Sequence, residues 1–429
     1  MPAHLTIQMG APSTSASPAA GLASGTGSAA NAAGSLSVKA SAAAGTGTAY
    51  QSGADPTWAI DLRTAMASGI TYTDTTTGVV SWTGAQLNSQ IAALGNGTSA
   101  TNRKRLIVSP GSTINMTGSD GIYLASKSYF ELILTGVNLT LNTDGSSNLG
   151  SGIFMQSSSY VAVRGGTFQG QNPNTGTANA VVTLDEQESA AVIRYACDHI
   201  ELDSITWYDL EGFGVITNSD GNTTGAAWPQ YVWVHDCYIE GGEMGMAAVS
   251  GRYLLWEDNT IVDSSWFAFD FEPDVTEQGY EHVLIQGNTI TRFGWEAIYS
   301  GAGGGHTHWL LAMNPADVAL GCVMDDLTFR NNTVTEGHIS GTPGPLGGGN
   351  IGGGGLLVRA DKTNTKNGVY ITGNVSSQAR TDSGGPMSFS NVNNLTVTGN
   401  TQVTLASAPL VGYDASPTGT HTVTPNTVS

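Results

Sequence analysis

Two carboxylates stand close together in the segment Phe269-Asp-Phe-Glu-Pro-Asp274. Asp270 and Glu272 are separated by one apolar residue, and alternate side chains of an extended strand point to the same side. Their Cα atoms would then lie roughly 6.6 to 7 Å apart. An acid and a base at this separation can hydrolyse a glycosidic bond with inversion. A hydrogen-bonded turn, or a cation site that links chains, explains the pair equally well.

A second polar set occupies the fourth position of a recurring strand. If successive strands stack in register, Asp203, His235 and Glu257 form one column. The two carboxylates would then lie about 9.6 Å apart across two coil rises. This value is near the upper end of the separation found in inverting glycosidases, so the column is the alternative catalytic candidate. It is more often the pattern of a solvated face, whose mixed charges keep a parallel sheet soluble.

Tryptophans gather in the same part of the sequence. Trp233 precedes His235 by two residues and is predicted to face outward, while Trp207 and Trp228 lie nearby. Aromatic rings with one polar edge are suited to stacking against sugars. These three residues are therefore the candidate glycan-binding residues, and they favour contact with a glycan over a purely structural spacer.

A repeated segment must position these residues. Its first and third residues are apolar, its second and fourth vary, and in the later copies its sixth is Asn. This alternation predicts a strand with one buried face. The aligned segments start at Leu132, Val161, Ile200, Val232, Leu254, Val283, Leu327, Val369 and Leu395. Repetition at intervals of 22 to 44 residues is typical of a solenoid.

A second strand follows within each coil, in residues 121–124, 152–155, 214–217, 245–248, 268–271, 297–300 and 355–358. Several strands per coil, glycine-rich corners and no long helical periods predict an all-β fold, a right-handed parallel β-helix. The sixth-position Asn tolerates a left-handed turn and can stack its amide on that of the next coil.

The outward positions of the second strand form a mostly apolar stripe, read as Tyr123, Phe154, Val182, Ile216, Ala247, Asp270, Tyr299 and Leu357. Monomers rarely expose such a stripe. The sequence therefore predicts association through this face, with a homotrimer as the expected assembly.

The composition limits the classes of partner and ligand that the protein can bind. The net charge of −19 argues against nucleic acid, and no window of the sequence is apolar enough to span a membrane. Cys197, Cys237 and Cys322 are an odd number without metal-binding spacing, which predicts free thiols. His306 and His308 lack a third ligand in pattern and are interpreted as surface residues. We expect neither a metal nor a cofactor.

Four regions are predicted along the chain. Residues 1–55 are rich in Ala, Gly, Ser and Thr and cannot bury enough apolar area to fold alone. Residues 56–111 form an N-terminal cap, with a short helix starting at a capping-box pattern, Thr83-Gly-Ala-Gln86. Residues 112–404 form the β-helix, and residues 405–429 are a tail that frays or caps its far end.

The leader also carries a resemblance. Ala42-Ala-Ala-Gly-Thr-Gly-Thr-Ala-Tyr50 is similar to low-complexity segments of minor tail proteins from phages of actinobacteria, and the predicted β-helix resembles phage tailspikes. The resemblance implies a virion protein at the tail tip, attached to other tail proteins by its leader. It also agrees with a chain start that has no secretory signal pattern. The expected role is contact with host surface polysaccharide during adsorption, through the coils between Ile200 and Val369.

The alternative is a polysaccharide depolymerase, either a glycoside hydrolase or a lyase, carried on the tail or secreted. Asn218-Ser-Asp-Gly221 resembles the first acidic motif of polygalacturonases. The paired aspartates, Gly-His-Gly and Arg-Ile-Lys elements that should follow are missing, which favours binding over cleavage.

Overall fold

The computed structural model divides the chain into two units, residues 1–51 and 52–429. It describes residues 54–428 except 118–120, 143–150, 172–188, 211, 220–227, 243, 265–266, 294–309, 314–320, 337–357, 361–364, 377–386, 403–410, 414–417 and 424–425. Residues 1–53 of the leader, both histidines of the 306–308 pair and most of the loops 217–231 and 299–326 lie outside the described residues. All described residues belong to the second unit.

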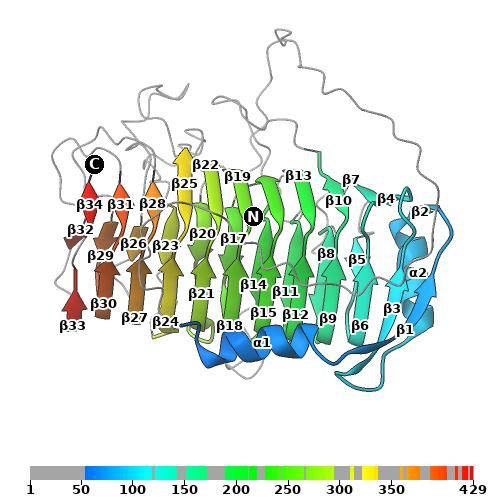
Figure 1. Cartoon of the computed structure of the whole chain (residues 1–429), viewed down its shortest axis with the longest axis horizontal. Helices are drawn as coiled ribbons and strands as arrows, with labels where there is room; N and C mark the ends of the chain where they lie inside the picture. Colours follow the sequence, from blue (N-terminus) through cyan, green and yellow to red (C-terminus); the bar gives the residue numbers. More distant parts are fainter. Residues whose placement is uncertain are drawn as a thin grey trace, which may run out of the picture. The chain divides into compact units, whose positions relative to one another are not determined.

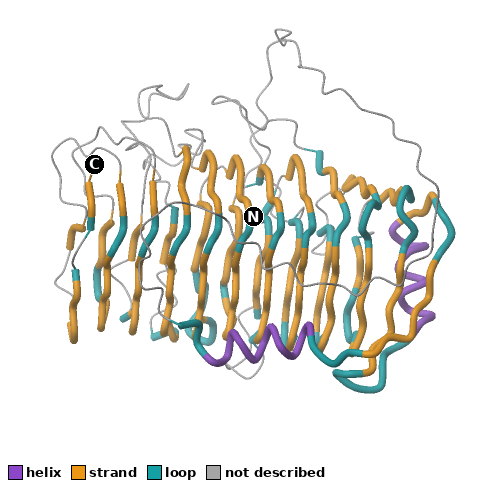
Figure 2. Tube along the Cα trace, in the orientation of Figure 1, coloured by secondary structure: helices purple, strands orange, loops and turns teal. Residues whose placement is uncertain are grey.

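Three parallel sheets make up this unit (Figures 1 and 2). Each turn of the chain contributes one strand to each sheet, except that the first and last turns contribute only to sheets A and B. Sheet A contains β1 (Thr71–Thr76), β3 (Asn102–Ile107), β6 (Ser128–Ile133), β9 (Ser159–Arg164), β12 (Asp198–Asp203), β15 (Gln230–His235), β18 (Ser250–Glu257), β21 (Gly279–Gln286), β24 (Val323–Arg330), β27 (Lys366–Thr372), β30 (Val392–Thr398) and β33 (Thr418–Thr422).

The other two sheets complete each coil. Sheet B contains β2 (Ser81–Thr83), β4 (Thr113–Thr117), β7 (Asn138–Asn142), β10 (Thr167–Gln169), β13 (Thr206–Leu210), β16 (Tyr238–Gly241), β19 (Thr260–Ser264), β22 (Thr289–Phe293), β25 (Thr333–Glu336), β28 (Val375–Ser376), β31 (Thr401–Gln402) and β34 (Thr427–Val428). Sheet C contains β5 (Ile122–Tyr123), β8 (Ile153–Gln156), β11 (Ala191–Arg194), β14 (Val215–Asn218), β17 (Met244–Ala248), β20 (Phe267–Phe271), β23 (Leu311–Met313), β26 (Val358–Ala360), β29 (Met387–Phe389) and β32 (Val411–Tyr413).

The protein is a right-handed parallel β-helix, which confirms the predicted fold class. The register of sheet A also follows the sequence repeat, since Val161 pairs with Ile200 and each later segment start pairs with the next. The first start is wrong by two residues, because Phe130 and not Leu132 pairs with Val161. The inward side chains of all three sheets form one continuous apolar core.

The predicted asparagine stack is present and joins Asn259, Asn288, Asn332, Asn374, Asn400 and Asn426. From Asn288 onward, each side chain accepts hydrogen bonds from the backbone and amide nitrogens of the Asn one coil earlier, as Asn332 Oδ1 does from Asn288 at 2.9 Å. The left-handed conformation, however, falls on the residue before this column. Positions occupied by Ser204, Asp236, Asp258, Gly287, Asn331, Gly373 and Gly399 have φ between 53° and 68°.

Two helices flank the coils. The predicted helix is α2 (Gly84–Leu94), with the Thr83–Gln86 capping box formed as expected. It lies at the N-terminal end of the stack, where Leu87 and Ile91 join the core (Figure 1). The other helix, α1 (Thr57–Ala67), was not predicted and lies across sheet A.

The expected region boundaries need two corrections. The coils begin before residue 112, because β1 and β2 of the predicted cap already pair with β3 and β4. They also continue beyond residue 404, because the predicted tail supplies β32, β33 and β34 to the three sheets. Asn426 extends the asparagine stack into this last coil, so its amide keeps the backbone of the previous coil hydrogen-bonded.

The apolar stripe of sheet C is also corrected. Its third member is Val192, since this residue pairs with Phe154, while Val182, Tyr299 and Leu357 lie outside the described residues. Phe154, Ile216 and Ala247 are buried in a cluster of their own, and Tyr123 remains exposed. The stripe is therefore largely covered within the described part of the chain, and the homotrimer stays a prediction without this support.

Other expectations concern thiols and membranes. Cys197, Cys237 and Cys322 are all free, as predicted, and all three are buried. Among the described residues, no helix has the length and hydrophobicity needed to cross a lipid bilayer.

Candidate functional site on the outer face of sheet A

Helix α1 covers the middle of sheet A from outside. Three residues at helical spacing, Ala59, Leu62 and Met66, form its buried face. They pack against Ala162, Trp233, Leu255 and Leu284, which project outward from four coils. The helix therefore completes a second apolar layer on the side of the sheet opposite to the core.

Charged contacts hold this segment along its length. Asp55, just before the helix, pairs with Arg330 of β24 and, at 2.5 Å, with Arg63. Arg63 in turn forms a double contact with Glu257 of β18. At the other end, Arg103 Nη2 of β3 donates to the carbonyl of Ala65 at 2.9 Å. A cation next to the last carbonyls of a helix is favourable.

The predicted polar column exists in register. Arg164, Asp203, His235, Glu257, Gln286 and Arg330 pair in succession along sheet A. Arg164 contacts three carboxylates: Glu131 at 2.5 Å, Glu201 at 2.7 Å and Asp203 at 2.5 Å. Cationic and anionic side chains thus occupy successive coils, so neighbours one coil apart attract one another.

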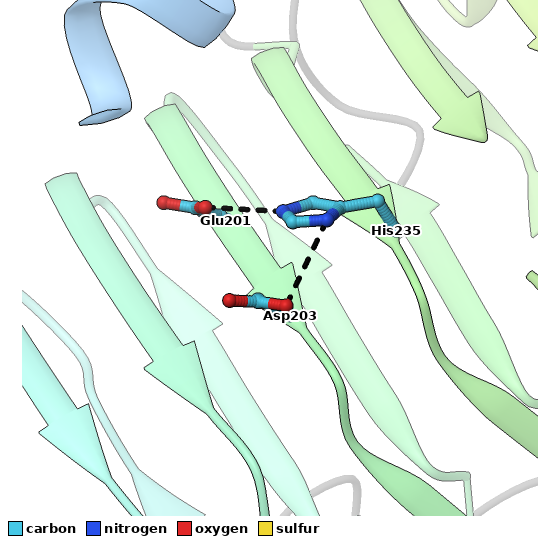
Figure 3. Close-up of side chains that lie close together, drawn as sticks. All are labelled: Glu201, Asp203 and His235. Atoms are coloured by element: carbon cyan, nitrogen blue, oxygen red, sulfur yellow. Dashed lines mark hydrogen bonds and ion pairs between the residues drawn. The ribbon is translucent and has the colours of Figure 1, made fainter. Parts of the chain in front are cut away.

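His235, on the following coil, contacts two of these carboxylates, Glu201 and Asp203 (Figure 3). Its Nε2 lies 3.1 Å from Glu201 Oε1, and its Nδ1 lies 3.7 Å from Asp203 Oδ1 and 2.9 Å from Asp236. Burial alone would lower the pKa of His235, but hydrogen bonds to Asp236 and Glu201 outweigh it and raise this pKa to about 9.

Glu201, Asp203 and His235 are close enough for one cation to touch all three. A histidine ligand must, however, be deprotonated, and at neutral pH the His235 ring is held as imidazolium. Arg164 also supplies a positive charge to both carboxylates. The donor set therefore matches a buried ion-pair network better than a metal centre.

The raised pKa of His235 gives a pH-dependent stability. Because protonated His235 is favoured in the folded state, its contribution is complete below about pH 6.5 and is lost as the pH rises through about 9. We expect unfolding free energy to fall by on the order of 3 kcal/mol across this window. Guanidinium denaturation at a series of pH values would measure it. His235→Gln should flatten the profile, and an unchanged slope in that variant would contradict the assignment.

Glu257 is the most fully bonded carboxylate of the column. It accepts two bonds from Arg63, one from Trp233 Nε1 at 2.8 Å and one from Gln286 Nε2 at 2.8 Å. A general base must have a lone pair within reach of the substrate. The structure brings Asp203, His235 and Glu257 together as predicted, but binds them into ion pairs rather than leaving them open to a ligand.

The three candidate tryptophans need correction. Trp233 faces outward as predicted, but helix α1 covers it and leaves it 9% exposed. Trp207 lies in the core at 0% exposure, and Trp228 is 4% exposed, with Nε1 bonded to the Glu277 carbonyl. A stacking platform needs an open ring face. None of the three offers one, because all three rings are buried.

The other catalytic candidates lie on sheet C. Asp270 is in β20, at an outward position that pairs with Ala247 and Ala312, and is 2% exposed. Glu272 follows the end of this strand and is half-buried. Asp270 therefore has little surface through which to reach a polymer, and the predicted acid and base remain a hypothesis.

Sequence reasoning missed a row of stacked rings. Tyr129, Tyr160, His199, Tyr231, Tyr253 and His282 lie one above another, with ring centroids 4.3 to 5.5 Å apart. All six are half-buried, and each has a positive φ that bends its strand of sheet A. We call them the aromatic ladder. Its members precede the first apolar residue of each segment, a column that could have been read from the sequence.

A recess opens where the ladder ends. Trp58, at the start of α1, packs against Tyr253, and His282 Nδ1 lies 2.8 Å from Asp326 on the next coil. Beyond them is a recess of about 230 Å³, lined by Ala54, Pro56, Trp58, Val283, Leu284, Asp326, Thr328, Arg330 and Tyr370. This recess combines aromatic and polar groups on the outer face of sheet A.

Comparison with known proteins identifies no family. Neither a protein family nor a curated protein sequence matches the chain. An alginate lyase from a Paenibacillus species has a similar solved structure, with a TM-score of 0.43, 13% identity and coverage of 80% of this chain and 99% of that one. A hyperthermoactive exopolygalacturonase from Thermotoga maritima has a TM-score of 0.44, 11% identity and coverage of 83% and 95%. A pectate lyase from a Bacillus species, solved in complex with trigalacturonate, has a TM-score of 0.29, 12% identity and coverage of 73% and 86%.

Proposed function

We propose that this β-helix binds a glycan of the host cell envelope without cleaving it, as a component of a phage tail tip. The observation that carries the binding role is the aromatic ladder. It is a row of half-buried rings with regular spacing, fixed by the same strand register over six coils. A repetitive polymer is matched by a surface that repeats at a constant interval.

The chemistry of the ladder suits hydroxyl-rich ligands. Because the rings stack on one another, they present their edges rather than their faces to solvent. A tyrosine phenol is protonated at neutral pH, and partial burial raises the pKa of Tyr160 and Tyr231 further. A protonated phenol can donate one hydrogen bond and accept others, which is what a sugar hydroxyl requires.

Two observations favour binding over cleavage. The carboxylates of the sheet A column are held in ion pairs with Arg164, His235 and Arg63. Asp270, on the other candidate face, is almost fully buried. The tail-tip location, attachment through the leader and homotrimeric assembly are supported by the sequence resemblance alone.

Adsorption to immobilised cell-envelope polysaccharide from actinobacteria tests the binding role. The double variant Tyr231→Phe/Tyr253→Phe keeps both rings stacked and removes two hydroxyls from the edge of the ladder. We expect it to adsorb several-fold more weakly than the wild type, because each lost hydrogen bond to a ligand weakens binding. Tyr208→Phe is the matched control, since Tyr208 is an exposed tyrosine of sheet B.

A reducing-end assay on the same polysaccharide tests the rival function. We expect no release by the wild type. Release that disappears in Asp270→Asn or Glu272→Gln would replace the binding proposal with a depolymerase. Equal adsorption by the double variant and the Tyr208 control would show that the ladder does not bind the polysaccharide.

A further inference from the structure

The recess beside helix α1 lies where the cover of sheet A changes from the helix to the chain segment that precedes it. Helix α1 lies mainly over β12, β15 and β18, whereas Ala54 and Pro56 precede the helix and border the recess over the later coils. The floor is a column of outward residues on three successive strands, Leu284, Thr328 and Tyr370. The coil register fixes the strands that line the recess, and the ion pairs of Asp55 fix the segment before the helix.

The size of the recess limits its occupant. A recess of about 230 Å³ is large enough for one sugar ring with its hydroxyls. Trp58 and Tyr370 are half-buried, so each keeps ring surface next to the recess. The apolar face of a pyranose stacks on such surfaces, while its hydroxyls need polar partners around them.

The polar groups of the recess favour a neutral ligand. Arg330 is the cation of the lining, but its guanidinium is already paired with Asp55 and donates to Gln286 Oε1 at 2.9 Å. Asp326 contributes a carboxylate whose side chain is 45% exposed and contacts His282. An anionic sugar would meet this carboxylate without an unpaired cation to offset it. A neutral sugar hydroxyl can instead donate to it.

From this arrangement we infer that the recess is a subsite for a single neutral hexose unit of a glycan. The unit stacks between Trp58 and Tyr370 and donates a hydroxyl hydrogen bond to Asp326. The inference rests on the proposed function, because the recess continues the aromatic ladder through the His282–Asp326 contact. It adds the chemical class and the place of one bound sugar.

Saturation-transfer NMR with the full-length protein tests the subsite. The probes are glucose, galactose, mannose and glucuronate, each as the free monosaccharide. We expect at least one neutral hexose to bind more tightly than glucuronate. Tyr370→Ala removes a stacking ring and Thr328→Trp fills the recess. Each should weaken the binding of that hexose about tenfold. Asp326→Asn should weaken it by less, since the amide oxygen still accepts a hydrogen bond.

Tyr208→Ala is the matched control for Tyr370→Ala, because it removes a tyrosine from the outer face of sheet B. It should leave hexose affinity unchanged. Absence of binding by all three neutral hexoses, equal affinity in Thr328→Trp, or preference for glucuronate would each overturn the inference. Retained adsorption of the wild type to polysaccharide in the first two cases would show that the glycan-binding function stands and that its site lies elsewhere.

Discussion

Deletion of residues 1–67 should destabilise the β-helix strongly, whereas deletion of residues 1–53 should not. The longer deletion removes helix α1 and exposes Trp233, Leu255 and Leu284 on the outer face of sheet A. It also leaves Glu257 and Arg330 without their partners in the removed segment. Loss of the three buried helix side chains alone amounts to on the order of 5 kcal/mol. Guanidinium denaturation of both truncated proteins would measure the difference.

The shorter deletion serves as the control, because it keeps Asp55 and the whole helix. Leu62→Ala/Met66→Ala in the full-length chain provides a second variant with the segment still present. It should lose part of the same stability through the same apolar contacts. Nearly equal denaturation midpoints for the two truncated proteins would mean that α1 is dispensable to the fold.

Asn288→Ala should be the most damaging single substitution in the asparagine stack. Asn288 Oδ1 accepts two hydrogen bonds from Asn259. Its Nδ2 donates to Asn332 Oδ1 and to the carbonyl of Trp256. All of these groups are buried, so the alanine variant removes the acceptor of the Asn259 backbone N–H on one side of the stack. It also takes one donor each from the Trp256 carbonyl and from Asn332 Oδ1. We expect a loss of about 3 kcal/mol or more in guanidinium denaturation.

Asn367→Ala is the matched control for this substitution. Asn367 also bonds to the coils on either side, to Asp325 at 2.6 Å and to Asn393 at 3.2 Å, but it is exposed. Water replaces these bonds, so the expected loss is below about 1 kcal/mol. Similar losses for the two variants would show that burial of the amide is unimportant to the stack.

The strand register could be predicted because it depends on local alternation. Each coil repeats the same inward and outward positions, so aligning Val161 with Ile200 was sufficient to place Arg164 beside Asp203. The same repetition predicted the buried amide stack. The error at Leu132 arose because Phe130 and Leu132 are both apolar and inward, so alternation alone cannot choose between them.

The cover of sheet A could not be predicted in the same way. Whether Trp233 is exposed depends on a helix about 170 residues earlier in the chain, and strand alternation carries no information about it. A signal for the helix was present, since Ala59, Leu62 and Met66 follow helical spacing. This spacing does not identify their partners on the sheet, so the sequence indicates an open face for a charged column that is largely enclosed.

The spacing of the last asparagines has a consequence for how such a rod can change length. Asn374, Asn400 and Asn426 follow one another at 26-residue intervals. A duplicated 26-residue unit inserted here would meet the same amide partner above and below. It would move the C-terminal end outward by about 4.8 Å and leave the register of the preceding coils unchanged. The length of the β-helix can therefore be adjusted in discrete steps by gene duplication, without altering the coils that carry the aromatic ladder.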